Sequence, residues 1–158
     1  MNDNYLDILR DALEKKIEVL DKIMEQNKLQ EEILSADEVD FDAFEKTVDE
    51  KAGCIEKLNK LDNGFQMTYD RIKEELTEHK DAHREEIKKL QELIQDITEK
   101  SMNIQAGEKR NKETFQQKIS FSRKNMRSLK TANRVAANYY QNMNKLNVID
   151  SQFLDTKK

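Results

Sequence analysis

The chain has 158 residues, of which 38% are charged and 36% apolar, with a formal net charge of −4. This apolar share is too small for a wide globular core but suffices for narrow seams between helices. The single cysteine excludes an intramolecular disulfide and favours a reducing compartment. The absence of proline and the presence of only three glycines favour an all-α protein. We see no signal peptide and no apolar run near the roughly 18 residues of a membrane span, so we expect no membrane insertion and a cytoplasmic location.

The charge is distributed unevenly along the chain. Residues 1–100 hold 28 acidic and 16 basic side chains, whereas residues 101–158 hold 4 acidic and 12 basic ones. A basic end can bind nucleic acid, an acidic partner or an acidic part of the same chain. We favour the last of these, because a C-terminal helix that folds back would lie against acidic helices. We expect no nucleic acid partner.

The first predicted helix spans residues 1–34. Its apolar residues recur in steps of three and four, which marks one face of an α-helix, and the pattern weakens at Asn27. These residues are Leu6, Leu9, Leu13, Ile17, Leu20 and Met24.

The polar stretch 35–40 separates this helix from the next. Asp40 can cap the following helix, because its carboxylate can accept free amide hydrogens of the first turn. Val39 and Phe44 on either side of it suit a hydrophobic staple. A connection this short predicts that the first two helices are antiparallel neighbours.

The second predicted helix is very long and central, covering residues 41–104. As one helix it would be about 96 Å long, and its apolar stripe would need to be covered by another helix of this or another chain. Gly64 predicts either a kink or close helix contact, or a true break. The stripe consists of Phe44, Val48, Ile55, Leu58, Phe65, Tyr69, Ile72, Leu76, Leu90, Ile94, Ile97 and Ile104.

The apolar pattern is lost over residues 99–114, where Gly107 indicates a turn or a helix with little to pack on. A third helical segment is predicted at 108–146, followed by a tail, 147–158, that is mobile unless a partner holds it. The whole chain, 1–158, is expected to be a single elongated antiparallel helical bundle or coiled coil, with the third segment packing back or projecting.

The sequence offers little for chemistry. His79 and His83 are four residues apart and could chelate a metal, but no third ligand is placed by spacing, and the glutamate of zinc proteases is missing. There is no glycine-rich phosphate loop, and no nucleophile has a placed base. We therefore expect no catalytic site, no metal and no cofactor, and we predict that the protein is not an enzyme.

A patch near the C-terminal end is the best candidate for binding. Tyrosine and methionine are over-represented at adaptable binding surfaces. Two alternatives stand: the patch packs on the long helix, or it is a surface for a partner. The candidate partner-binding residues are Val135, Tyr139, Tyr140, Met143 and Leu146.

The chain resembles flagellar export chaperones of the FlgN type over roughly residues 5–104. The resemblance rests on the stripe from Leu6 to Leu20, on the start of the second helix at 40–45, and on its continuation. That continuation comprises Val48-Asp49-Glu50-Lys51, Ile55-Glu56-Lys57-Leu58, Leu61-Asp62, Phe65, Tyr69, Arg71-Ile72 and Glu75-Leu76.

The resemblance implies a cytoplasmic chaperone that binds terminal helices of hook–filament junction proteins, the hook-associated proteins, and delivers them to the type III export gate. It also implies that the C-terminal segment carries the client-binding helix and a tyrosine that contacts the gate. On this chain the tyrosine is Tyr139 or Tyr140, and Val135, Met143 and Leu146 are the client contacts. The tail 147–158 matches no pattern of the family, and the related filament-cap chaperone is similar in size and pattern.

The alternative is a structural coiled-coil protein that acts as a homodimeric scaffold through its long helix and has no exported client.

Overall fold

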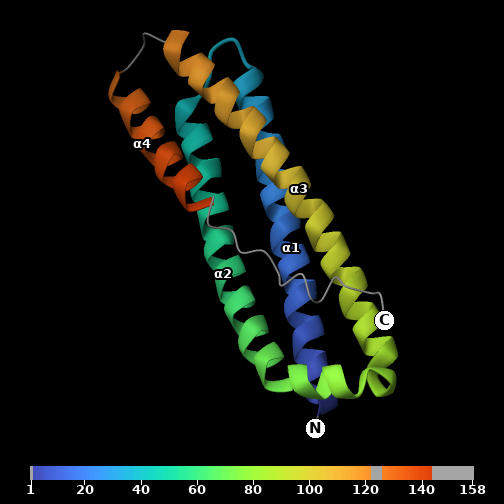
Figure 1. Ribbon diagram of the computed structural model, residues 1–158. Coiled ribbons are helices and arrows are strands. Elements are labelled where there is room, and N and C mark those ends of the chain that lie inside the picture. The colour runs from blue at the N-terminus through green and yellow to red at the C-terminus, as the bar shows by residue number, and fades with distance from the viewer. Residues whose placement is uncertain (1, 122–125, 144–158) are drawn as a thin grey trace.

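In the computed structural model, residues 2–121 and 126–143 are described, and they form an antiparallel bundle of long helices (Figure 1). The helices are α1 (Asn2–Ser35), α2 (Phe41–Glu78), α3 (Arg84–Phe121) and α4 (Met126–Met143), with a short 3₁₀ helix η1 (Lys80–His83) between α2 and α3. Helix α1 packs along both α2 and α3, and α4 packs back on α2. The predicted elongated all-α architecture is confirmed.

The connection between α1 and α2 forms as predicted. Asp40 is the N-cap of α2, and its carboxylate accepts a hydrogen bond from the backbone amide of Ala43 at 3.0 Å. Phe44 is fully buried, and Val39 is partly buried against the same hydrophobic core. Phe115 of α3 stacks on Phe44 with ring centroids 4.3 Å apart, which fixes this end of the bundle.

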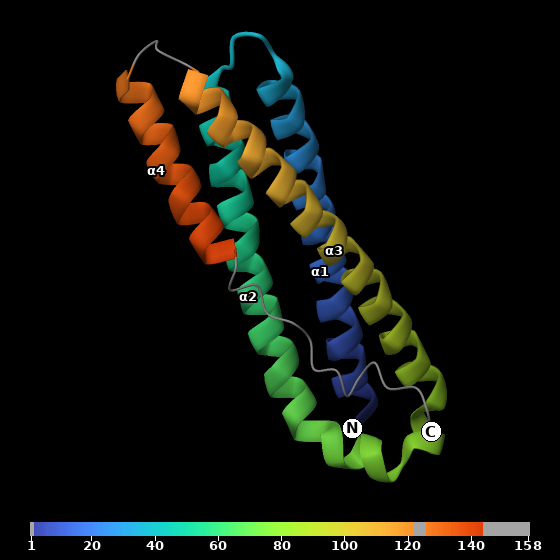
Figure 2. The same ribbon diagram turned by 45° about the horizontal axis from the view of Figure 1, so that its top comes forward.

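The prediction of one helix over residues 41–104 is wrong. Helix α2 ends at Glu78, and the chain turns through η1 so that α3 runs back antiparallel to α2 (Figure 2). Neither proline nor glycine marks this turn, but no residue of the stripe falls between Leu76 and Leu90. A helix without an apolar face to bury gains little from continuing, whereas folding back lets the two halves cover a common seam.

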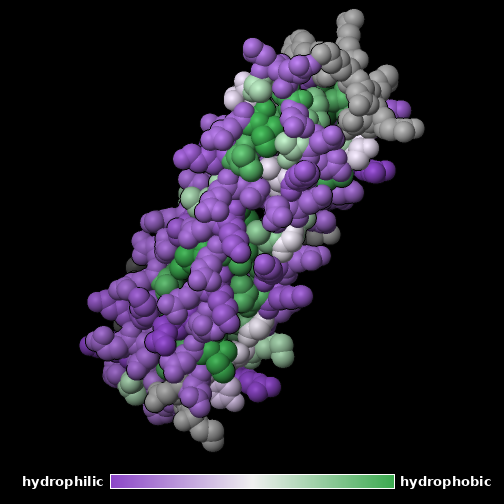
Figure 3. Space-filling view, turned by 180° about the vertical axis from the view of Figure 1, so that it is seen from behind, coloured by the Kyte–Doolittle hydropathy of each residue, from purple (hydrophilic) through white to green (hydrophobic). Residues whose placement is uncertain are grey.

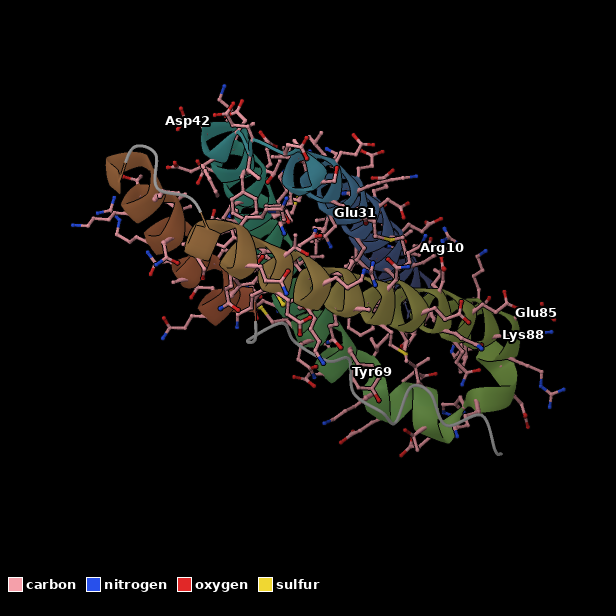
Figure 4. All side chains as sticks on the ribbon, turned by 90° about the horizontal axis from the view of Figure 1, so that it is seen from above. Arg10, Glu31, Asp42, Tyr69, Glu85 and Lys88 are labelled. Carbon is pink, nitrogen blue, oxygen red and sulfur yellow. The ribbon has the colours of Figure 1, made fainter. Side chains whose placement is uncertain are left out.

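The predicted stripe itself is confirmed, because all twelve of its residues are buried within the single chain. The hydrophilic surface is broken only by narrow apolar strips when the molecule is seen from behind (Figure 3). Charged side chains such as Arg10, Glu31 and Lys88 point outward from the bundle (Figure 4). Among the described residues, the large exposed apolar side chains are Ile8 and Leu29 of α1, Met67 of α2 and Met102 of α3.

The glycines behave differently from the expectation. Helix α2 continues through Gly53 and Gly64, and a Cβ at either position would meet nothing within 4 Å, so neither glycine breaks the helix or permits a close contact. The close helix contact occurs at Gly107, where a Cβ would lie 3.2 Å from the Nδ2 atom of Asn27. Of the two alternatives for residues 99–114, the turn is wrong and the continuing helix is correct, because α3 runs through Gly107. That part of α3 is nevertheless packed, since Ile104, Glu108 and Asn111 are buried.

The third predicted segment, 108–146, is divided between the end of α3 and α4. Of the two alternatives for it, packing back is confirmed. The tail 147–158 lies outside the described residues. Within the described ranges, no helix is both long enough and apolar enough to cross a membrane.

Candidate functional site on the docking surface of helix α4

Helix α4 lies along the N-terminal half of α2, as both ribbon views show (Figure 1, Figure 2). Its inner face is short and contains small and aromatic side chains. These buried residues are Ala132, Ala136, Tyr139, Tyr140 and Met143. Because α4 has only 18 residues, it depends on this face to remain helical.

The structure places the predicted partner-binding residues on this face rather than on an open surface. Tyr139, Tyr140 and Met143 are buried, Val135 is partly buried, and Leu146 lies outside the described residues. The alternative in which the patch packs on the second helix therefore describes this conformation. Binding of a partner by these residues stays a prediction, and it requires α4 to move.

A lysine is completely buried under α4. Lys51 of α2 has 0% of its surface exposed, and its ammonium group donates to Asn27 Oδ1 at 2.9 Å and to Gln30 Oε1 at 2.8 Å. It also donates to the carboxylate of Glu108 on α3, which is 3% exposed. All three hydrogens of the ammonium group thus have acceptors, which is the condition for burying a charge.

The same carboxylate reaches α4. One oxygen of Glu108 accepts from Lys51, and the other accepts a hydrogen bond from the phenol of Tyr139. The Lys51 ammonium also lies 4.5 Å from the centroid of the Tyr139 ring, within range of a cation–π interaction. We call Lys51, Glu108 and Tyr139 the polar latch, because this chain of contacts joins α4 to α2 and α3.

Helix α1 completes the cluster. Asn111 of α3 donates to the backbone carbonyl of Asn27 at 2.9 Å and to Gln30 Oε1 at 3.2 Å. Asn27, Gln30 and Asn111 are all buried. Polar side chains from α1, α2 and α3 therefore form a connected network in the middle of an otherwise apolar seam.

Burial is the main cause of the pKa shifts in and beside the polar latch. Desolvation lowers the pKa of Lys51, and the nearby Glu108 carboxylate opposes this shift. Desolvation also raises the pKa of Tyr139 and of Tyr140, and the negative charge of Glu108 raises both further. The tyrosines are consequently held in the protonated form, in which Tyr139 can donate to Glu108.

Among the described residues, two buried polar atoms in this region have no hydrogen-bond partner. They are the phenol oxygen of Tyr140 and the Nε2 atom of Gln30. A buried polar group without a partner costs about 1–3 kcal/mol. The docked position of α4 is thus stabilised by the Tyr139 hydroxyl and destabilised by the adjacent Tyr140 hydroxyl.

Sequence reasoning missed Lys51 and Glu108, although signals for both were present. The apolar pattern weakens at Asn27, skips from Val48 to Ile55, and is lost around Glu108. Each gap contains a polar residue of the buried network, namely Asn27, Lys51 and Glu108. Only the pairing of the helices shows that the three gaps lie at one level of the bundle.

The two histidines do not form a site on one α-helix. His79 caps the C-terminal end of α2 and His83 belongs to η1, with its Nε2 atom 3.4 Å from Glu75 Oε2. Across the part of the chain that the structure describes, no group of three or more histidine, cysteine, aspartate or glutamate side chains is arranged to hold a metal ion.

Three comparisons with known proteins were made, and one of them finds a match. A search of curated proteins and a search of solved structures each find no match to this chain. The model of one protein family, described as FlgN protein, matches residues 1–147 and so includes α1 to α4. Since this match covers nearly the whole chain, the protein belongs to the FlgN family of flagellar chaperones.

Proposed function

We propose that this protein is a cytoplasmic chaperone that binds terminal helices of hook–filament junction proteins and delivers them to the type III export apparatus. Membership of the FlgN family supports this role. A bare amphipathic helix of a client would expose an apolar stripe, and a helical groove can bury it as one more member of the bundle. The observation that carries the proposal is the docking of α4 on α2.

The client helix takes the place of α4 in this proposal. The docked face of α4 is short, contains two alanines, and leaves the Tyr140 hydroxyl without a partner. A longer client helix with larger apolar side chains would bury more surface in the same place. Released α4 would then expose Tyr139 and Tyr140 to the export gate, as the resemblance implies. Val135 and Met143 would also be exposed, and in this arrangement they are free for a further partner rather than for the helix that has replaced α4.

Calorimetric titration with the C-terminal helical segment of a hook–filament junction protein tests the proposal. We expect one-to-one binding, and stronger binding by the double variant Ala132→Glu with Ala136→Glu. Both alanines lie on the buried face of α4, so a charge at either position favours the released state of the helix. The client then no longer loses binding free energy to displace α4. The control is Asn133→Glu with Asn138→Glu, which adds the same charge to the exposed side of α4.

The titration tests two points separately: whether the client replaces α4, and whether the protein binds flagellar export clients. Weaker binding by the buried double variant would mean that docked α4 itself contacts the client. Absence of binding to the junction segment, and to the filament-cap protein tested in parallel, would refute the chaperone proposal.

A homodimeric scaffold is the less favoured function. The apolar stripe that would have driven dimerisation is buried within one chain. Sedimentation distinguishes the two, because the scaffold requires a stable dimer without a client.

A further inference from the structure

The surface under α4 is not a plain apolar groove, because it contains a buried ion pair. Lys51 and Glu108 are buried among α1, α2 and α3, and they meet α4 through the side chain of Tyr139. Any helix that occupies this surface in place of α4 must bury the same carboxylate. This requirement limits which helices can bind there.

We propose that the Lys51–Glu108 pair is the specificity-determining element of this surface, and that it selects helices with a hydrogen-bond donor at the position of Tyr139. The inference rests on the proposed function, because it assumes that a partner helix replaces α4. The partner is thus an amphipathic helix with small or apolar residues on its inner face and one phenol or amide group directed at Glu108.

The geometry explains why a donor is needed. One oxygen of Glu108 is occupied by Lys51, so the other is left for the docking helix. If an entirely apolar helix docked there, this oxygen would be buried without a donor, which is costly for a charged acceptor. A helix with a carboxylate at the same point would be rejected more strongly through repulsion of like charges.

The neighbouring tyrosine provides a contrast within the same helix. Tyr140 is buried beside Tyr139, with the ring centroids 5.4 Å apart, but its hydroxyl has no hydrogen-bond partner within the described ranges. The hydroxyl of Tyr139 therefore favours docking and that of Tyr140 opposes it. Phenylalanine at either position keeps the ring, including the ring of residue 139 beside the Lys51 ammonium.

Hydrogen exchange on the full-length protein tests the first part of the inference. For Tyr139→Phe we expect protection of the α4 amides to fall by about tenfold or more, the equivalent of one hydrogen bond to a charged group. For Tyr140→Phe we expect unchanged or increased protection. Amides of α1 provide the internal reference. Equal effects of the two variants, or no effect of Tyr139→Phe, would overturn the inference.

The second part uses peptides as stand-in helices. Two peptides of residues 126–143, one natural and one carrying Tyr139→Phe, are titrated into the full-length Tyr139→Phe protein, whose own α4 is weakened. The natural peptide should bind at least about tenfold more tightly. Equal affinities, or no binding by either peptide, would contradict the inference. Neither experiment contains a junction protein or an export-gate protein, so failure of this inference is distinguishable from failure of the proposed chaperone function.

Discussion

Replacing Lys51 and Glu108 singly and together gives the most direct test of the buried network. Lys51→Met leaves the Glu108 carboxylate, 3% exposed, without its cation. Removing one partner of a buried ion pair costs about 3–5 kcal/mol. For a chain of this size, about 1 kcal/mol corresponds to 2–4 °C in Tm, so we expect Tm to fall by roughly 6–20 °C. Glu108→Met should have a similar effect, because it leaves the Lys51 ammonium buried without a carboxylate.

The double variant is expected to be less damaged than the two single variants suggest. It contains no unpaired buried charge, and apolar replacement of a whole buried pair is often close to neutral. Urea denaturation followed by circular dichroism should give a coupling free energy of about 2 kcal/mol or more. Single variants whose effects simply add within about 0.5 kcal/mol would refute the view that the two side chains share one buried site.

Two further predictions concern glycine and pH. Gly53→Ala and Gly64→Ala should each raise the free energy of unfolding by about 1 kcal/mol, because a Cβ enters open space within a helix. Gly107→Ala should raise it less or lower it, because a Cβ there meets Asn27. Urea denaturation measures all three changes. The pKa values of Tyr139 and Tyr140 are raised, so the folded protein keeps two protons that the unfolded chain releases near pH 10. The contribution of the two tyrosines to the free energy of unfolding should therefore be present below pH 10 and be lost progressively above it. The double variant Tyr139→Phe with Tyr140→Phe should lose less free energy of unfolding than the natural protein between pH 9 and 11.5. Equal losses would contradict the conclusion that these two tyrosines are buried in the protonated form.

The fold class and the core could be predicted from the sequence because helical periodicity is a local property. Steps of three and four identified twelve buried apolar residues of α2 and α3 between Phe44 and Ile104. Asp40 was recognisable as a cap for the same reason, since its role depends only on the next few residues. The tyrosines of α4 were also visible as a candidate site.

The position of the turn and the composition of the site were decided only by tertiary structure. No proline or glycine ends α2 at Glu78, and a gap in the apolar stripe after Leu76 does not by itself specify a turn. The chain folds back there because that arrangement covers both halves of the stripe. Likewise, Lys51 and Glu108 are ordinary charged residues in the sequence, 57 positions apart. Each is tolerable in the core only because the other is there. Such pairing across helices is a property of the packed bundle, so no pattern along one helix could have specified it.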